Sequence, residues 1–565
     1  MSQKRIRISA DFETTVDPSD ARVWASCAVD IDTLETVFIG NSIESFFDWL
    51  SDKNTICYFH NLKFDGEFIL SYLLNNGFTF SEKNESKTFR TLITDGGIFY
   101  SITVIFEKKN KKYKKVVFYD SLKKLPFKVA TISKAFNLPD EKLVIDYKAP
   151  RPIGHELTEE ERAYIVNDCR IVAGALQIQI NEGLEKMTNA SDALAHFKEG
   201  ITLSHFEKFF PTFPIELDSF IRKAYKGGYV YLIPRHKNAR GLQGVMFDVN
   251  SLYPSVMYQK VLPYGYPIYF YGEPETTADY PLFIVHLKCA FDLKPDHLPT
   301  IQLKNNRAYV ETEYLTSSNG DVVDLTLTNV DLDLFLDHYD VTDLTYVKGL
   351  KFKGRAGFFK EYIDYWGHVK ETTTGAKRQL AKLMLNSLYG KFATNPKAYQ
   401  KRPRLDEDGI VRYDVINEKF CREHELPPPE DRDPVYTAMG CFITAYAREK
   451  TIRSGQSVYD RFIYADTDSL HLTGFEIPED IDIHPTKLGA WKHEGTFTDS
   501  KFIRAKTYME TTEEGTKVTC AGMPDNVKAK VTYENFKSGS TFEGKLMPKR
   551  VKGGVVLVDT TFTIK

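Results

Sequence analysis

Two sets of acidic residues, each at the end of a short apolar strand, constrain this chain more than any other feature. The first set begins in IRISADFET, where Asp11 and Glu13 stand two residues apart. Residues two apart in a strand point to the same face of a sheet. The second set begins much later, where Asp248 follows the apolar stretch GVMF. The sequence therefore predicts two separate sheets, each with carboxylates at a strand end.

The first set gains two further acidic elements. Asp65 ends HNLKFD where a helix begins, and in YIVND Tyr164 and Asp168 are four residues apart, on one helical face. A single surface Asp is more often a solvated or capping residue. The three elements together favour a two-metal nuclease, because hard carboxylates hold Mg²⁺ or Mn²⁺ across a phosphodiester. The Tyr164 hydroxyl can orient the attacking water.

The second set is completed by YADTDS, a hairpin-like sequence in which Asp466 and Asp468 flank Thr467. On the other side, Asp248 precedes an expected Ser-Leu-Tyr-Pro turn. Two carboxylates on adjacent strands would bind two divalent ions and leave positions for triphosphate oxygens.

A helix predicted over AKRQLAKLMLNSLYG separates the two parts of the second set. Arg378, Lys382 and Asn386 repeat every four residues, and Tyr389 follows seven after Lys382. The residues expected to face a core are Leu380, Leu383, Met384 and Leu388. The cationic stripe suits a triphosphate, whose pyrophosphate gains charge as it leaves. An ordinary amphipathic helix with a solvated Lys face is the alternative, and this helix alone does not exclude it.

A length of 565 residues, at about 100–200 residues per domain, predicts several domains. Strands are predicted at 5–15, 22–31 and 36–40, and helices at 42–52, 65–77 and 158–180, the last with Thr158 and Glu161 as a capping box. This α/β domain is expected to close near 185–191. The later regions are a β-rich stretch at 227–345, helices at 364–392 and 438–455, the hairpin-like 461–474 and a final strand at 554–565.

Composition excludes several classes of protein. A net charge of −3 gives no global basic excess, so a nucleic acid would be held by local patches. No apolar run approaches the about 20 residues of a spanning helix, and the start lacks a signal peptide. The seven cysteines form no CxxC pair, which disfavours a disulfide framework or a zinc site. We expect a cytoplasmic protein with no membrane partner.

The motifs together resemble those of family B DNA polymerases. DFET, NLKFD and YIVND look like the three exonuclease motifs, and DVNSLYPS, KLMLNSLYG and YADTDS look like polymerase motifs A, B and C. KTY, which begins at Lys506, resembles the lysine motif near the primer terminus. The small size, AYKGGY and the long stretch between motifs A and B resemble the protein-primed polymerases of the small tailed Bacillus bacteriophages, over essentially the whole chain.

The resemblance implies an α/β and α+β multidomain fold. An RNase H-like 3′ to 5′ exonuclease domain would be followed by a right-hand polymerase of palm, fingers and thumb, with two terminal-protein-region insertions. The implied bounds are exonuclease 1–188, palm 189–260, first insertion 261–357, fingers 358–394, second insertion 395–433, palm 434–528 and thumb 529–565. The second insertion looks longer than is usual in the family.

The resemblance also implies roles for single residues. In the exonuclease site the metal ligands would be Asp11, Glu13, Asp65 and Asp168, assisted by Tyr164 and Lys142. The single strand would be held by His60, Asn61, Phe64, Ser121 and Leu122, with Phe64 as an aromatic face.

In the polymerase site Asp248, Asp468 and the Val249 carbonyl would bind metal, and Asp466 would support them as a further catalytic residue. The nucleotide would be held by Tyr253, Lys370, Arg378, Lys382, Asn386 and Tyr389. Primer-template DNA would contact Tyr225, Gly227, Gly228, Ser251 and Lys506.

The implied function is a protein-primed, processive and strand-displacing replicative DNA polymerase with proofreading. It would use two Mg²⁺ per active site, with Mn²⁺ able to substitute, and dNTPs. Its partners would be primer-template and single-stranded DNA and a terminal protein, bound as a heterodimer by an otherwise monomeric chain in the cytoplasm of an infected bacterium.

Two other function classes remain as alternatives. A dedicated nuclease would leave YADTDS without a role, and a non-enzymatic single-strand-binding factor would explain neither carboxylate set.

Basic segments offer candidate phosphate contacts. In the first insertion these are Lys304, Arg307, Lys351, Lys353 and Arg355. KKNKKYKK at 108–115 is expected to be a hairpin tip, for which a solvated edge guard is the alternative to DNA contact. MPKRVKGG at 547–554, in the thumb region, is the better candidate for duplex contact.

Overall fold

A computed structural model describes residues 5–110, 112–302, 314–397, 399–429 and 432–565. Its largest sheet has the order β3-β2-β1-β4-β8-β7-β6-β5. The strands are β1 (Ile6–Thr14), β2 (Val23–Asp30), β3 (Thr36–Gly40), β4 (Thr55–Phe59), β5 (Thr79–Phe80), β6 (Thr88–Ile93), β7 (Phe99–Lys109) and β8 (Lys112–Asp120). The apolar, β-branched β1 pairs antiparallel with β2 and parallel with β4, so it lies inside the sheet.

Helices cover this first sheet as the periodicity predicts. They are α1 (Ile43–Leu50), α2 (Leu62–Asn75), α3 (Val129–Phe136) and α4 (Glu159–Asn181), with the short 3-10 helix η1 (Ser121–Lys123) after β8. The capping box at the start of α4 is confirmed. The Thr158 side chain accepts from the Glu161 backbone N–H, and the Glu161 carboxylate accepts from that of Thr158 at 3.0 Å. The three strands and three helices predicted in this region are also confirmed.

A second, five-stranded sheet has the order β21-β10-β20-β19-β9. Its strands are β9 (Val230–Leu232), β10 (Gly244–Val249), β19 (Phe462–Asp466), β20 (Ser469–Thr473) and β21 (Trp491–Phe497). Three helices, α5 (Asn189–Ile201), α6 (Leu203–Phe209) and α7 (Ile215–Arg222), connect the first sheet to it, and the largely buried α13 (Thr437–Ser457) packs against it. Because β10 and β20 pair antiparallel with Asp248 opposite Ser469, motifs from distant parts of the chain meet.

The region between motifs A and B forms its own four-stranded sheet, β11-β16-β12-β15. The strands are β11 (Leu262–Tyr271), β12 (Leu282–Leu293), β15 (Val323–Thr328) and β16 (Tyr339–Arg355), with a small pair β13 (Ile301–Gln302) and β14 (Tyr314–Leu315). Lys304 and Arg307, two of the expected phosphate contacts, lie outside the described residues.

Two helices interrupt the stretch that the sequence predicts as β-rich. The sequence of α9 (Asn329–His338) alternates apolar and acidic residues, a pattern typical of a strand, but Thr328 caps the helix by accepting from the Asp331 N–H.

The prediction of a Ser-Leu-Tyr-Pro turn after Asp248 is wrong as well. Ser251 is left-handed, with φ 55°, and α8 (Leu252–Gln259) starts immediately after it. Proline is compatible with a first helical turn, where its missing N–H has no intrahelical partner.

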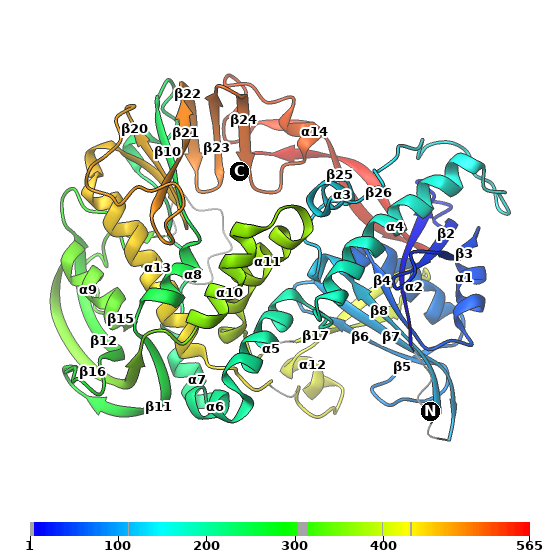
Figure 1. Cartoon of the computed structure of the whole chain (residues 1–565), viewed down its shortest axis with the longest axis horizontal. Coiled ribbons are helices and arrows are strands. Elements are labelled where there is room, and N and C mark those ends of the chain that lie inside the picture. The colour runs from blue at the N-terminus through cyan, green and yellow to red at the C-terminus, as the bar shows by residue number, and fades with distance from the viewer. Residues whose placement is uncertain (1–4, 111, 303–313, 398, 430–431) are drawn as a thin grey trace.

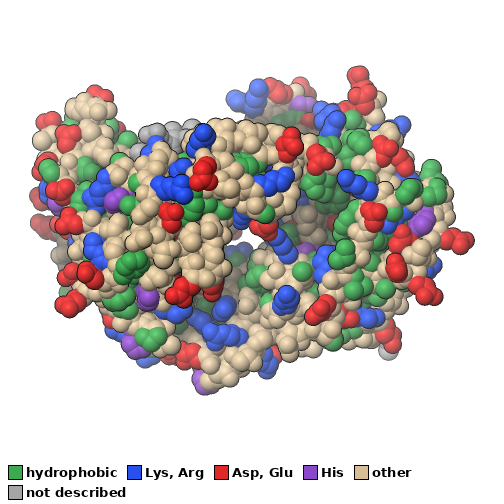
Figure 2. All heavy atoms as spheres, turned by 90° about the horizontal axis from the view of Figure 1, so that it is seen from above, with side chains coloured by type: hydrophobic (Ala, Val, Ile, Leu, Met, Phe, Trp, Pro, Cys, Tyr) green, Lys and Arg blue, Asp and Glu red, His purple; other side chains and the backbone are tan. Residues whose placement is uncertain are grey.

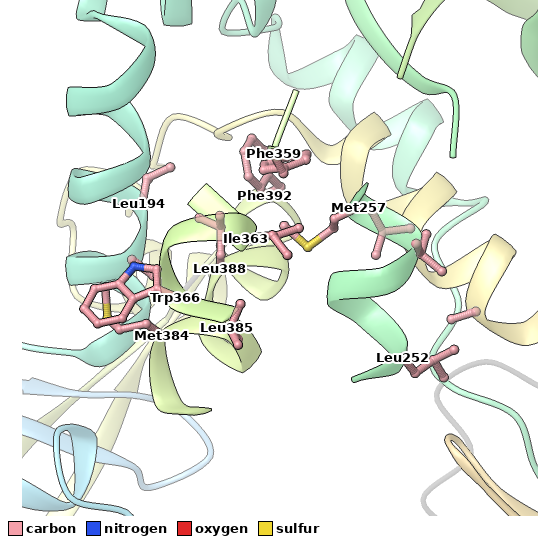
Figure 3. Packing of buried hydrophobic residues seen from close by; sticks show 14 of the residues in the cluster. Leu194, Leu252, Met257, Phe359, Ile363, Trp366, Met384, Leu385, Leu388 and Phe392 are labelled. Atoms are coloured by element: carbon pink, nitrogen blue, oxygen red, sulfur yellow. The ribbon is translucent and has the colours of Figure 1, made fainter. Parts of the chain in front are cut away.

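The cationic helix predicted between the acidic motifs is α11 (Gly375–Phe392), preceded by α10 (Lys360–Thr372). Leu380, Met384 and Leu388 are buried as predicted. Leu383 is only half-buried, and the side chain buried with them is Leu385. Figure 3 shows the cause: apolar side chains reach α11 from more than one direction, among them Leu194 of α5 and Met257 of α8.

The C-terminal part contains three smaller sheets. The hairpin of β17 (Gln400–Leu405) and β18 (Val411–Ile416) is followed by α12 (Glu418–Glu423), and β22 (Asp499–Arg504), β23 (Thr507–Thr512) and β24 (Gly515–Cys520) form a meander before α14 (Asp525–Lys528). The last hairpin, β25 (Thr541–Val551) and β26 (Gly554–Thr563), extends from this meander across to the first sheet and its helices (Figure 1).

None of the helices in the described ranges is long and apolar enough to cross a membrane. Seen from above, the molecule is hollowed near its centre, and Lys and Arg side chains border the hollow (Figure 2).

Candidate active sites

The first sheet and two of its helices bring one set of carboxylates together. Asp11 and Glu13 lie on β1, Asp65 lies in the first turn of α2, and Asp168 lies on α4. Glu13, Asp65 and Asp168 are all nearly inaccessible to solvent. The strand and helix patterns therefore place all four predicted ligands in one region.

Burial raises the pKa of all four carboxyls. Repulsion from neighbouring carboxylates raises it further for Asp11, Glu13 and Asp65. The pKa of Asp11 is raised to about 7 by burial and then by Asp168. Burial and Asp11 raise the pKa values of Glu13 and Asp65 well above the ordinary range. Buried carboxylates that repel one another are stabilised by an added cation.

A divalent ion fits this donor set chemically. All four side chains offer hard oxygen ligands, and Asp168 Oδ1 is buried with no hydrogen-bond partner in the described parts of the chain. Over those same parts, no group of three or more His, Cys, Asp or Glu is already arranged to hold a metal ion. The ligand roles therefore remain predictions.

Lys142 joins this cluster from an irregular segment between α3 and α4. Its Nζ pairs with Asp168 and donates to the Tyr164 hydroxyl at 3.1 Å. Burial lowers the pKa of Lys142, but the hydrogen bond and negative charge of Asp168, together with Tyr147 and Asp11, outweigh burial and leave the pKa raised. Tyr147, which sequence reasoning missed, places its hydroxyl 2.5 Å from that of Tyr164. It lies in the same irregular segment, where no periodicity could have indicated it.

Two of the residues predicted to hold a single strand, Asn61 and Leu122, are joined by one missed residue, Asp120. Asp120 Oδ1 accepts from the backbone N–H groups of Asn61, at 3.2 Å, and Leu122, at 3.1 Å. His60 contacts Ser121 Oγ at 2.9 Å. Phe64 is half-buried at the start of α2. The signal for Asp120 was its position as the last residue of the apolar stretch VVFYD.

The second sheet brings the other acidic motifs together. The Val249 N–H donates to the Asp468 carbonyl at 2.7 Å, which fixes the end of β10 against the turn before β20. Burial, and then the neighbouring Asp468, raises the pKa of Asp248 to about 7. Burial also raises the pKa of Asp468. Asp248 and Asp468 again offer hard oxygen ligands, and a bound divalent cation would stabilise their ionised forms.

Asp466 is bound differently from its two neighbours. Lys506 Nζ lies 2.9 Å from both of its carboxylate oxygens, and the Lys506 N–H donates to the Tyr464 hydroxyl at 2.9 Å. The turn between β19 and β20 also demands a glycine nearby, because a Cβ on Gly228 would lie 2.6 Å from Thr467 Oγ1. The predicted DNA contacts Gly228 and Lys506 thus both lie beside this turn.

The predicted nucleotide residues occupy α8, α10 and α11. Tyr253 and Tyr389 stack with ring centres 4.0 Å apart. Lys370 Nζ donates to Ser251 Oγ at 3.0 Å, and the Arg378 guanidinium donates to the Lys370 carbonyl.

The remaining predicted contacts lie on helix surfaces and connecting segments. Lys382 and Asn386 are exposed on α11, while Tyr225 is half-buried. The Gly227 carbonyl accepts from Arg448, at 2.8 Å. Arg448 is a buried residue that sequence reasoning missed.

Some of the basic residues predicted to contact phosphate are exposed, and others are engaged by neighbouring side chains. Lys353 and Arg355 are exposed, as is Lys108 near the predicted hairpin tip. Lys111 lies outside the described residues. In MPKRVKGG, Arg550 is held by Glu67 of α2 at 2.8 Å instead of lying free on the surface.

Comparison with known proteins identifies relatives over the whole chain. The family model described as DNA polymerase type B, organellar and viral, matches residues 49–153 and 145–484. The DNA polymerase of Bacillus phage phi29 is 48% identical, covering 99% of this chain and 98% of its own. That of Bacillus phage B103 is 46% identical, covering 99% and 100%.

Solved structures match equally well. The orthorhombic crystal form of phi29 DNA polymerase matches all of both chains with a TM-score of 0.95 and 47% identity. The same enzyme complexed with primer-template DNA and incoming nucleotides matches with a TM-score of 0.93 and 47% identity, again over both whole chains.

Proposed function

Because this chain belongs to the type B DNA polymerases of organelles and viruses, and is a DNA-directed DNA polymerase, we propose how its two carboxylate sites divide the work. The second sheet would catalyse nucleotide addition, and the first sheet would remove mispaired 3′ ends. One observation carries this proposal: the two sets of buried, mutually repelling carboxylates gather at two different sheets, one set around β1 and the other around β10. The domain bounds inferred from the sequence are proposed with it.

In nucleotide addition, a 3′-hydroxyl attacks the α-phosphate of a dNTP and pyrophosphate leaves. Asp248, Asp468 and the Val249 carbonyl would hold Mg²⁺, or Mn²⁺ in its place. When bound, the ions lower the pKa of the attacking hydroxyl and neutralise charge on the phosphates. Lys382 and Arg378 would attract the triphosphate, and Tyr253 and Tyr389 would hold its sugar and base. Lys506 keeps Asp466 in place beside the ligands.

In 3′ end removal, water attacks the phosphorus of the last phosphodiester and the P–O3′ bond breaks. A nucleoside 5′-monophosphate is released, and the shortened strand takes up a proton to end in a 3′-hydroxyl. Asp11, Glu13, Asp65 and Asp168 would hold the ions of this site. The Tyr164 hydroxyl, fixed by Lys142, would orient the water. His60, Asn61, Ser121 and Leu122, gathered around Asp120, would bind the frayed strand, and the Phe64 ring would stack on a base.

We also propose that the first hydroxyl comes from a terminal protein, which this otherwise monomeric polymerase binds as a heterodimer in the cytoplasm of its bacterial host. The separate sheet β11-β16-β12-β15 and the β17–β18 hairpin support this proposal as two additions to the polymerase body. Primer-template DNA would contact Tyr225, Gly227, Gly228 and Ser251.

Incorporation of labelled dNTPs on a primed template tests the polymerase assignment. A dedicated nuclease or a single-strand-binding factor would show none. Incorporation with a purified candidate terminal protein and no oligonucleotide tests protein priming, and products that stay free of that protein would contradict it.

A further inference from the structure

Glu67 is a buried carboxylate of α2 that the proposed chemistry does not use. It lies two residues after Asp65, and its side chain is 4% exposed. Its Oε2 accepts a hydrogen bond from the Tyr413 hydroxyl at 2.9 Å, and its Oε1 accepts from Arg550 Nε at 2.8 Å. Tyr413 belongs to β18 and Arg550 to β25. One carboxylate therefore joins three segments that are far apart in the chain.

The two partners of Glu67 also contact each other. The Arg550 guanidinium lies 4.7 Å from the centre of the Tyr413 ring, within the range of a cation–π interaction. Phe99 of the first sheet also packs against Tyr413, with its ring edge-on at 6.2 Å between centres. We call Glu67, Tyr413 and Arg550 the three-way latch.

An apolar core surrounds the latch and belongs to all three segments. Val411 of β18 and Val551, Val555 and Val556 of the last hairpin share one buried cluster with Phe68 of α2. The approach at the hairpin tip is close, because a Cβ on Gly554 would lie 2.4 Å from the Phe68 ring. Figure 1 shows β25 and β26 reaching this place from the β22–β24 meander at the top of the view.

The helix that the latch holds is the one that carries two predicted exonuclease residues. Asp120 fixes the start of α2 through the backbone N–H groups of Asn61 and Leu62, at 3.2 and 3.3 Å. Phe64 and Asp65 follow, and Glu67 comes next on the same helix. The first turn is thus held at one end by its own sheet and further along by two hairpins from elsewhere. A misplacement of about 1 Å in a catalytic group can cost about a hundredfold in rate.

We propose that Glu67 is a positioning residue, and that the three-way latch sets the position of α2 so that 3′ end removal depends on both the β17–β18 and β25–β26 hairpins. This inference rests on the proposed exonuclease function of the first sheet. The geometry of the exonuclease site then depends on three segments of the chain and not on the exonuclease domain alone. The competing explanation is that the latch adds stability and nothing else.

The test uses the full-length protein with three substitutions: Glu67→Gln, Arg550→Met and Tyr413→Phe. The mildest is Tyr413→Phe, which removes one hydroxyl and keeps the ring under Arg550. Arg412→Ala is the matched control, because Arg412 adjoins Tyr413 but pairs with Asp406 inside its own hairpin. Each variant is assayed for kcat and KM on a 3′ single strand, for single-dNTP addition and for melting temperature.

We expect Glu67→Gln and Arg550→Met to lower kcat for strand removal about tenfold, and Tyr413→Phe to lower it about threefold. Single-dNTP addition should stay within about twofold of the original protein, as should both activities of Arg412→Ala. Combining Glu67→Gln with Arg550→Met should cost little more than either change alone, because both remove the same contact.

Other outcomes overturn the inference in distinguishable ways. If the variants lose melting temperature while strand removal is unchanged, or lose both activities equally, the latch is only structural. Additive effects in the double variant would also contradict a shared contact. If the original protein does not degrade a 3′ single strand at all, the proposed exonuclease function fails instead of the latch.

Discussion

The rings of Tyr253 and Tyr389 stack 4.0 Å apart at an angle of 17°, joining the first turn of α8 to α11. Each ring comes from a different predicted nucleotide-binding motif. The stack therefore connects the strand end that carries Asp248 to the helix that carries Lys382.

This contact leads to a prediction about sugar selection. In the nucleotide site the Tyr253 ring would lie where a ribose 2′-hydroxyl projects, so Tyr253→Val should admit ribonucleotides. The ratio of dNTP to rNTP incorporation efficiency should fall at least about tenfold. Tyr389→Phe keeps the stacked ring and serves as the control. An unchanged ratio in Tyr253→Val would remove this role.

The two activities should separate by mutation, because their carboxylates gather at two different sheets. Asp468→Ala should lower dNTP incorporation on the order of a thousandfold through loss of a metal ligand, yet leave degradation of a 3′ single strand largely intact. Asp11→Ala with Glu13→Ala should do the reverse. Both rates are measured on one protein preparation after its folding is checked by circular dichroism. Loss of both activities in either folded variant would contradict the two-site assignment.

Metal binding should reverse a pH-dependent loss of stability. Burial raises the pKa of Asp11 and of Asp248 to about 7, so the folded metal-free chain keeps protons that the unfolded chain releases near pH 4. The contribution of these groups to stability is therefore present below about pH 4 and is lost as the pH rises to about 7.

Melting curves between pH 5 and 8 measure this effect. Mg²⁺ should raise the melting temperature more at pH 8 than at pH 5, since it binds the ionised carboxylates. The gain should shrink in Asp11→Ala with Glu13→Ala, and shrink again when Asp248→Ala is added. An equal Mg²⁺ response in all variants would argue against both ligand sets.

The sheet β11-β16-β12-β15 should clamp DNA and help to receive the terminal protein. Tyr264 and Lys353 are partners across β11 and β16, so a short Gly/Ser linker can join them when the segment between them is removed. Such a protein should keep single-nucleotide addition, but should make shorter products from a nicked duplex and initiate weakly on the terminal protein. The deletion also removes Asp331, which pairs with the buried Arg448. The melting temperature of the shortened protein is therefore measured as the control for folding. Full-length strand-displacement products would contradict the clamp.

The features that could be predicted from the sequence are those that depend on local order. Asp11 and Glu13 share a face because they stand two apart in an apolar strand, and Thr158 caps α4 because Glu161 follows three residues later. Tyr164 and Asp168 lie on one side of a helix because they are four residues apart. Neighbours in the chain fix each of these relationships.

Tertiary structure alone decided the contacts between distant segments. Asp120 gathers the strand-binding residues, Lys506 holds Asp466, and Arg550 crosses from the last hairpin to Glu67. Leu385 is buried instead of Leu383 because several elements pack on α11. Such contacts have no periodic signature, since they depend on how whole sheets and helices pack, and that packing is set by the shared core and not by any short stretch of sequence.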